Sequence, residues 1–257
     1  MDERDAHGQT VQATETSFTV VEYLKEQDGA RLYEVADDLG LANSTAHKHL
    51  ATLVDLGYVV REGNEYHLGL EFLHIGGLIR DRKKVNRLSM PVVRSLADRT
   101  GEQVQFIVEE NGRGYHVYTS PGDQAVRVDT RIGKRIYLHA NASGKAMMAY
   151  WDPERVDAVV DQWGLPAVTQ HTITDRDELF EELEAVRERG YAYNLEEHIV
   201  GYRGVAAPVC SHDGEVLGAL GVGGPTRRLK DDWLREDLPE MTLEAVNEFE
   251  LKVEFAV

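Results

Sequence analysis

The segment from Arg31 to Leu68 constrains the fold more than any other part of the chain. Its first apolar residues follow helical spacing, and Gly40 comes where a left-handed residue would end that helix. A second helical pattern runs from about Asn43 to Leu56. Its inner face carries Ala46, Leu50, Leu53 and Val54. Two short segments, Tyr58–Arg61 and Glu65–Leu68, then flank a glycine-containing turn at residues 62–64, as in a hairpin. This order of helix, glycine turn, helix and hairpin predicts a winged helix-turn-helix.

The outward side of the second helix has the composition of a surface that reads DNA. Small, polar and mildly basic side chains suit a helix that enters the major groove. The residues expected to contact DNA are Asn43, Ser44, Thr45, His47, Lys48 and Thr52 on the helix, and Arg61 and Asn64 on the hairpin. The sequence therefore predicts double-stranded DNA as a partner. The alternative is a three-helix core that binds no nucleic acid.

Length and composition leave room for a second, larger domain. A chain of 257 residues can hold one domain of about 70 residues and one of about 170. No apolar stretch approaches the roughly 18 residues of a membrane span, and the N-terminus lacks a signal pattern. We therefore expect a cytoplasmic protein without a membrane partner. Cys210 is the only cysteine, so an intramolecular disulfide and a cysteine-rich zinc site are excluded, and we expect no metal or cofactor.

Acidic residues outnumber basic residues by a wide margin. The formal net charge is −17, and residues 1–80 alone carry 14 acidic and 6 basic side chains, a net charge of −8. A DNA-binding domain usually has a basic surface, so this charge by itself argues against DNA binding. Arginine exceeds lysine by 20 to 8. This pattern is typical of a salt-filled cytoplasm, where the Debye length is about 3 Å at 1 M salt. We expect a halophilic protein, with an ordinary acidic protein as the alternative.

The flanking sequence divides the chain further. Residues 1–15 are polar and aperiodic, which predicts a flexible tail. Thr16 or Ser17 is expected to cap the first helix of a DNA-binding domain that covers residues 16–69. Residues 70–82 are expected to form an apolar linker helix. That helix packs either against a second copy of the chain or against its own domain.

A cationic run follows the predicted linker helix. Residues 80–87 hold five basic residues and one acidic residue. Such a run is usually a solvated helix face, and contact with phosphates or a partner subunit is the alternative. Ser89 with Pro91 is expected to open the next helix, which should stop at Gly101.

Residues 83–257 are expected to form one domain of mixed structure. A hairpin signal at Asn111–Gly112 joins two apolar runs. The remaining expected elements are short strands at 125–128, 134–138, 191–193, 205–209 and 216–222, and helices near 146–149, 153–163, 178–189 and 238–253. Strand hairpins with helices between them predict an α+β fold in which helices cover an antiparallel sheet.

Four short motifs occur along the chain in a fixed order. They are Ser44–Leu53, Leu138–Ala146, Arg189–Ala192 with Glu196–Glu197, and Ala206–Pro208. Together they resemble the IclR family of transcriptional regulators over nearly the whole chain after the tail. The resemblance implies an N-terminal winged helix-turn-helix, a linker helix and a C-terminal GAF-like effector domain, assembled as a homodimer or homotetramer. Family members usually regulate catabolic operons in response to small metabolites, often carboxylates.

The resemblance also implies where a small-molecule effector would bind. The expected effector-binding residues are Ala142, Ser143, Asn194, Gly204, Gly221 and Gly223. A helix start at Ala142 would offer unpaired N–H groups to a carboxylate or sugar-derived anion. Several family members carry Asp, Cys and two Ser where this chain has Asn194 and the three glycines. That difference implies a larger cavity and a ligand other than the smallest oxoacids. Tight strand packing is the alternative reason for Gly221 and Gly223, and a domain without a ligand is the alternative to an effector site.

An enzyme and a protein-interaction module are the competing functional interpretations. Walker A, HExxH, GxSxG and GxGxxG motifs in the required context do not occur. Cys210 has His212 nearby but no third partner, so it is expected to be structural, and no residue is assigned as catalytic. The charge of residues 1–80 favours an interaction module without DNA binding. The motifs favour a DNA-binding regulator whose effector domain alters promoter binding.

Overall fold

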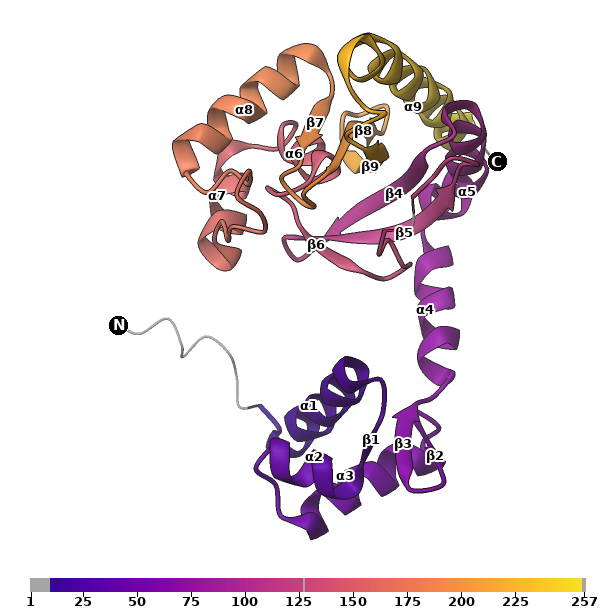
Figure 1. Cartoon of the computed structure of the whole chain (residues 1–257), viewed down its shortest axis with the longest axis vertical. Helices are drawn as coiled ribbons and strands as arrows, with labels where there is room; N and C mark the ends of the chain where they lie inside the picture. The colour runs from indigo at the N-terminus through magenta and orange to yellow at the C-terminus, as the bar shows by residue number, and fades with distance from the viewer. Residues whose placement is uncertain (1–9, 127, 256–257) are drawn as a thin grey trace. The chain divides into compact units, whose positions relative to one another are not determined.

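The computed structural model describes residues 10–126 and 128–255 of the chain. Its contacts divide the chain into two compact units, Met1–Ile79 and Arg80–Val257 (Figure 1).

The first unit is a three-helix core with a small antiparallel sheet. Its elements are α1 (Gln12–Gln27), β1 (Ala30–Arg31), α2 (Leu32–Asp38), α3 (Asn43–Asp55), β2 (Val59–Glu62) and β3 (Glu65–Leu68). The sheet order is β1-β3-β2, and Gly63 turns the hairpin with a φ of 63°. The apolar stripes expected from the sequence meet in one core, which includes Leu24, Val35, Ala46 and Leu50. The predicted winged helix-turn-helix is confirmed. The two-residue strand β1 has no sequence periodicity and was not expected.

The first helix begins earlier than the sequence pattern indicates. Thr16 and Ser17 do not cap it, because each hydroxyl donates a hydrogen bond to a carbonyl four residues earlier in the same helix, at 2.9 and 3.0 Å. Such back-bonding places these residues inside a helix rather than at its start. Residues 12–15 of the expected tail are therefore helical. Residues 1–9 of that tail lie outside the described residues.

Two consecutive helices follow the wing. The helix α4 (Glu71–Arg82) begins near the expected linker start, and α5 (Lys84–Thr100) follows after an extended Lys83 with φ −87° and ψ 134°. The expected start of the second helix at Ser89 is wrong. Ser89 is buried inside α5, where its hydroxyl donates a hydrogen bond to the Asn86 carbonyl. Pro91 also lies inside the helix and not at its start. Gly101 ends α5 in the left-handed region, with a φ of 71°.

The cationic run at the break between α4 and α5 satisfies backbone carbonyls. Arg87 donates to the Asp81 carbonyl at 2.6 Å, and the Asn86 amide donates to the Arg80 carbonyl at 2.9 Å. The Arg80 guanidinium lies 4.8 Å from the centre of the Tyr118 ring, at cation–π distance. The last carbonyls of a helix lack partners within the helix, so these side chains stabilise its end.

The second unit is built around a six-stranded antiparallel sheet in the order β6-β5-β4-β9-β8-β7. The strands are β4 (Gln103–Glu110), β5 (Arg113–Pro121), β6 (Arg135–Tyr137), β7 (Ala192–Leu195), β8 (Tyr202–Cys210) and β9 (Val216–Pro225). The hairpin predicted at Asn111–Gly112 is present, with φ angles of 53° and 74° that suit a two-residue turn. The expected strand at 125–128 is wrong for its described residues, which pair with no strand; Arg127 lies outside them.

Helices cover both faces of this sheet (Figure 1). On one face lie α5, the π-helical turn η2 (Trp233–Asp237) and α9 (Leu238–Phe255), around a core that includes Phe106 and Phe249. On the other face lie α6 (Ala142–Met148), α7 (Pro153–Trp163) and α8 (Arg176–Arg189), around a second core. The short helix expected at 146–149 therefore begins at Ala142. The mixed α+β architecture with an antiparallel sheet is confirmed.

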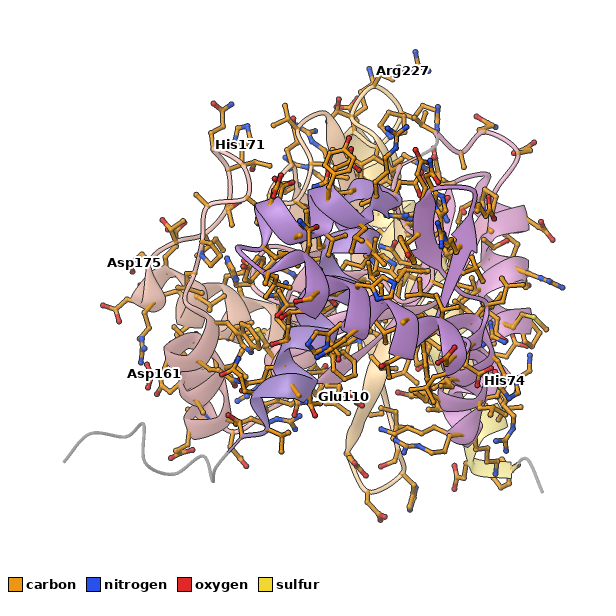
Figure 2. The ribbon with its side chains drawn as sticks, turned by 90° about the horizontal axis from the view of Figure 1, so that it is seen from below. His74, Glu110, Asp161, His171, Asp175 and Arg227 are labelled. Atoms are coloured by element: carbon orange, nitrogen blue, oxygen red, sulfur yellow. The ribbon has the colours of Figure 1, made fainter. Side chains whose placement is uncertain are left out.

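The loop after β9 is tied to the neighbouring central strand of the sheet. Arg227 points into solvent (Figure 2), whereas Arg228 turns inward and donates two hydrogen bonds to the carboxylate of Glu102, at 2.6 and 2.7 Å. Glu102 is buried, so this bidentate pair ties the loop to the start of β4. Among the residues that the structure describes, no helix is long and apolar enough to cross a membrane.

Candidate functional sites in the two domains

One side of α3 presents polar side chains to solvent. The exposed residues of the expected DNA-reading set on this helix are Asn43, Ser44, His47, Lys48 and Thr52. Thr45 is half-buried, and the Thr52 hydroxyl donates to the Lys48 carbonyl at 2.9 Å. The opposite side of the helix packs into the core of the first unit. The geometry thus presents a polar helix face of the kind that enters a DNA groove.

The wing holds the other two expected DNA contacts at its tip. Arg61 and Asn64 are both exposed. Arg61 also stabilises the turn, since its Nε donates to the Gly63 carbonyl at 3.0 Å and its guanidinium lies 5.7 Å from the centre of the Tyr66 ring. The Arg61 guanidinium therefore already has one partner on its face, the Tyr66 ring.

A side-chain contact that the sequence did not indicate joins α1 to α3. Ser17 Oγ lies 2.8 Å from His49 Nδ1, and His49 is half-buried between the outward face of α3 and its core face. This hydrogen bond joins residues 32 positions apart. No local pattern could have predicted it.

The structure brings all six expected effector residues around one cavity in the second unit. Ala142, Ser143, Asn194, Gly204, Gly221 and Gly223 all line it. The volume open to the centre of a water molecule is about 30 Å³. A single water needs roughly 10–15 Å³ by this measure, so the cavity has room for a few non-hydrogen atoms.

The expectation of an enlarged cavity is wrong, because neighbouring groups fill the space above the glycines. A Cβ at Gly223 would lie 2.5 Å from the Tyr202 ring, and one at Gly221 would lie 2.8 Å from Ser143 Oγ. A Cβ at Gly204 would lie 2.5 Å from the Val222 carbonyl oxygen, which belongs to the neighbouring strand. Gly204 therefore serves close strand packing, and Gly221 leaves room for the Ser143 hydroxyl.

Part of the anion-binding capacity expected at the start of α6 is already used. The Asn141 side chain caps the helix and accepts a hydrogen bond from the Ser143 N–H at 2.9 Å. The oxygen of Asn194 is also occupied, because it accepts from the backbone N–H groups of Glu197 and His198, at 3.1 and 3.3 Å. The helix start is thus a weaker candidate for anion binding than the sequence suggested.

Three buried polar atoms in the cavity wall have no hydrogen-bond partner. They are Ser143 Oγ on α6, His116 Nδ1 on β5 and His198 Nδ1 on the loop between β7 and β8. Burial lowers the pKa of His116 to about 4, and it also lowers the pKa of His198, so both imidazoles are neutral near pH 7. Neither histidine was identified from the sequence, because nothing in the local pattern places them at the same cavity.

A buried ion pair holds the loop that carries His198. Lys145 is 1% exposed, and its Nζ lies 2.6 Å from Glu197 Oε1 and 3.4 Å from Glu182 Oε1. The Glu197 carbonyl also accepts a hydrogen bond from the Thr172 hydroxyl at 2.7 Å. Burial raises the pKa of Glu197, and Lys145 opposes that shift. This network fixes the loop against α6 and α8.

The structure offers no catalytic site at the cysteine. Burial raises the pKa of the Cys210 thiol to about 11, so it stays protonated and is a poor nucleophile. His212, two residues later, has an 80% exposed side chain that lies 3.8 Å from Glu254. Within residues 10–126 and 128–255, no three His, Cys, Asp or Glu side chains converge as metal ligands.

A winged helix-turn-helix joined in one chain to an antiparallel-sheet domain with a small polar cavity defines a class of DNA-binding regulators with a sensor domain. Residues 79–249 match the family model "Bacterial transcriptional regulator IclR C-terminal", and residues 14–63 match "IclR helix-turn-helix domain". The chain therefore belongs to the IclR family of transcriptional regulators, which are not enzymes.

Individual relatives agree with this assignment. The chain is 30% identical over 241 residues to the probable HTH-type transcriptional regulator ArcR of Halobacterium salinarum, covering 92% of each chain. A putative regulator from Rhodococcus sp. RHA1 has a similar structure, with a TM-score of 0.82, 25% identity, and 95% of this chain and 98% of that chain covered. An IclR homologue from Microbacterium hydrocarbonoxydans, crystallised with 4-hydroxybenzoate, gives a TM-score of 0.80 at 23% identity, with 94% and 98% covered.

Proposed function

We propose that α3 and the wing of this regulator read a DNA operator while the cavity beside α6 binds a small effector that alters promoter binding. One observation carries the proposal: each domain has a free polar site, on the exposed face of α3 and around the cavity. A catabolic operon is the proposed target, and a carboxylate or sugar-derived metabolite is the proposed effector. The effector would meet the unpartnered Ser143 hydroxyl in the cavity wall.

Lys48→Ala tests the reading face. Lys48 is the exposed cation on the outward side of α3, and a good base contact is worth about 1–3 kcal/mol of discrimination. We expect the variant to lose its footprint on the DNA upstream of its own gene, while its fold and oligomeric state stay unchanged. The measurement is a footprint and a gel shift at molar KCl.

Lys25→Ala provides the matched control for that experiment. Lys25 is a half-exposed lysine in the last turn of α1 that pairs with Glu22, and it lies outside the reading set. This variant should keep the wild-type footprint. A Lys48→Ala protein that footprints like wild type would show that α3 is not the reader. If wild type itself binds no DNA, the acidic first unit is a protein-interaction module.

Exposed apolar side chains on α4 and directly before it support the proposal that the protein is a homodimer or homotetramer. Leu70, Leu73, Leu78 and Ile79 are 79%, 71%, 63% and 56% exposed. A concentration of exposed large apolar side chains usually packs against another surface. We expect Leu73→Glu to shift the protein toward monomer in sedimentation velocity, because a buried charge would oppose pairing. An unchanged sedimentation coefficient would place the oligomer contact elsewhere.

The acidic surface leads us to propose that the protein works at high salt. A protein that neutralises six phosphates would show a log–log slope of affinity against salt near about −5. Here cations must bridge carboxylates and phosphates, so uptake of ions offsets their release. Between about 0.5 and 2 M KCl we expect a shallow or positive slope in gel shifts. A steep negative slope would contradict adaptation to salt.

A further inference from the structure

Two imidazoles and a hydroxyl converge on the cavity from three separate segments. His116 is 3% exposed and comes from β5, Ser143 is fully buried on α6, and His198 lies on the loop after β7. Each has one buried polar atom without a hydrogen-bond partner. A buried polar atom left unpaired costs stability, so three around one cavity indicate a partner that binds there.

The segments that carry these atoms are fixed. The backbone of His116 is bonded on both sides, because its N–H donates to the Lys134 carbonyl at 3.1 Å and its carbonyl accepts from the Gly133 N–H at 2.8 Å. The loop of His198 is held by the Asn194 side chain and by the ion pair of Glu197 with Lys145. The cavity is therefore preorganised for a ligand.

Two charged side chains act on the imidazoles. In addition to burial, Lys134 lowers the pKa of both histidines, whereas Asp129 raises the pKa of His116 alone. Asp129 is the only charged residue among the described residues that line the cavity, and its carboxylate lies 3.1 Å from Lys134 Nζ. Lys134 and the 85% exposed Arg131 lower the pKa of Asp129 to about 2, so it stays ionised. Burial raises the pKa of Tyr202, so its hydroxyl stays neutral. Among the described lining residues, the two histidines are therefore the only bases that a bound carboxylate would bring to titrate between pH 5.5 and 7.5.

We propose that a small carboxylate enters this cavity together with one proton, which is held between the carboxylate and the imidazole nitrogens of His116 and His198. The proton comes from solvent, and Ser143 donates a further hydrogen bond to the ligand. This inference rests on the proposed role of the cavity as the effector site. The free volume of about 30 Å³, against roughly 10–15 Å³ for one water molecule, favours the smallest carboxylates.

The direction of the pH dependence follows from the proton count. The free imidazoles are neutral above their lowered pKa values, and a carboxylate beside them raises the pKa of the bound site. The complex then holds one proton more than its separated components. Affinity therefore rises as the pH falls through the pKa of the complex.

Calorimetric titration of the full chain tests the proposal. The probes are formate, acetate and lactate, each matched to its neutral amide, at pH 5.5 and 7.5 and in buffers of different ionisation enthalpy. We expect at least one of these carboxylates to bind at least tenfold more tightly at pH 5.5 and to take up close to one proton. The amides should show no pH dependence.

Three variants complete the test. His116→Gln and His198→Gln should each weaken carboxylate binding and reduce the tenfold pH ratio to less than threefold. The matched control His212→Gln removes an exposed histidine outside the cavity and should keep the full ratio. If His116→Gln does not fold, His198→Gln alone decides the result.

The outcomes separate this inference from the proposed function. Equal carboxylate affinity at both pH values, or no binding of any of the three carboxylates, would overturn the proton-coupled site. If the wild-type footprint still responds to a metabolite extract in that case, the effector function stands and only the inference fails. If the footprint responds to neither the extract nor the probes, the effector function fails as well.

Discussion

Replacing Lys145 by methionine is expected to lower the free energy of unfolding of the effector domain by about 3–5 kcal/mol. Lys145 is 1% exposed and faces Glu197, which is 6% exposed. Methionine keeps most of the side-chain volume but leaves the Glu197 carboxylate buried without its cation. Urea unfolding followed by tryptophan fluorescence measures the effect, because Trp151, Trp163 and Trp233 all lie in this domain.

The matched control is Lys252→Met on α9. Lys252 pairs with Glu248 at the surface, where both side chains are about half exposed. Exposed pairs contribute at most about 1 kcal/mol, so this variant should unfold close to wild type. Equal losses in the two lysine variants would contradict a special role for the buried pair.

The pH dependence of Lys145→Met gives an independent check. Burial already raises the pKa of Glu197, and removal of Lys145 should raise it further. The folded state then binds a proton that the unfolded state releases, so stability is present at low pH and is lost as the pH rises through the folded-state pKa. The loss in free energy of unfolding caused by Lys145→Met should therefore be smaller at pH 5 than at pH 8. The double variant Lys145→Met, Glu197→Gln should recover part of the loss at pH 8.

The sequence predicted most of the fold because most elements are encoded locally. The helical stripes of α2 and α3, the glycine turn of the wing and the Asn111–Gly112 hairpin each depend on residues within one element. Errors arose where a side chain can act in two ways. The hydroxyls of Thr16, Ser17 and Ser89 resemble helix caps in sequence but bind carbonyls within their helices.

The candidate effector site was predicted only in part, for a different reason. Motifs located the residues of α6, β8 and β9. His116 comes from β5 and His198 from the loop after β7, and only the folded domain brings them to the same cavity. The three glycines were expected to enlarge the cavity because they lack the side chains that family members carry at these positions. In the fold, Tyr202 and Ser143 occupy that space.

Gly204→Ala is expected to destabilise the effector domain by about 1–3 kcal/mol, the usual cost of forcing an extra group into a packed core. A Cβ at this position would lie 2.5 Å from the Val222 carbonyl oxygen and 3.2 Å from the Gly223 Cα. Both atoms belong to the backbone of β9, which pairs with β8 at Gly204↔Gly223, so the strands themselves must move apart. Tryptophan fluorescence during urea unfolding again measures the change.

Gly221→Ala is the matched comparison, because it adds the same methyl group to the same strand pair, opposite Ala206. Its Cβ would lie 2.8 Å from Ser143 Oγ, a single side-chain atom that can rotate away. We therefore expect a smaller loss of stability than for Gly204→Ala, together with weaker effector binding because the added methyl group faces the cavity. If Gly204→Ala is as stable as wild type, β8 and β9 can separate without cost. Strand packing would then not explain the glycine, and its place in the cavity wall would be the reason for it.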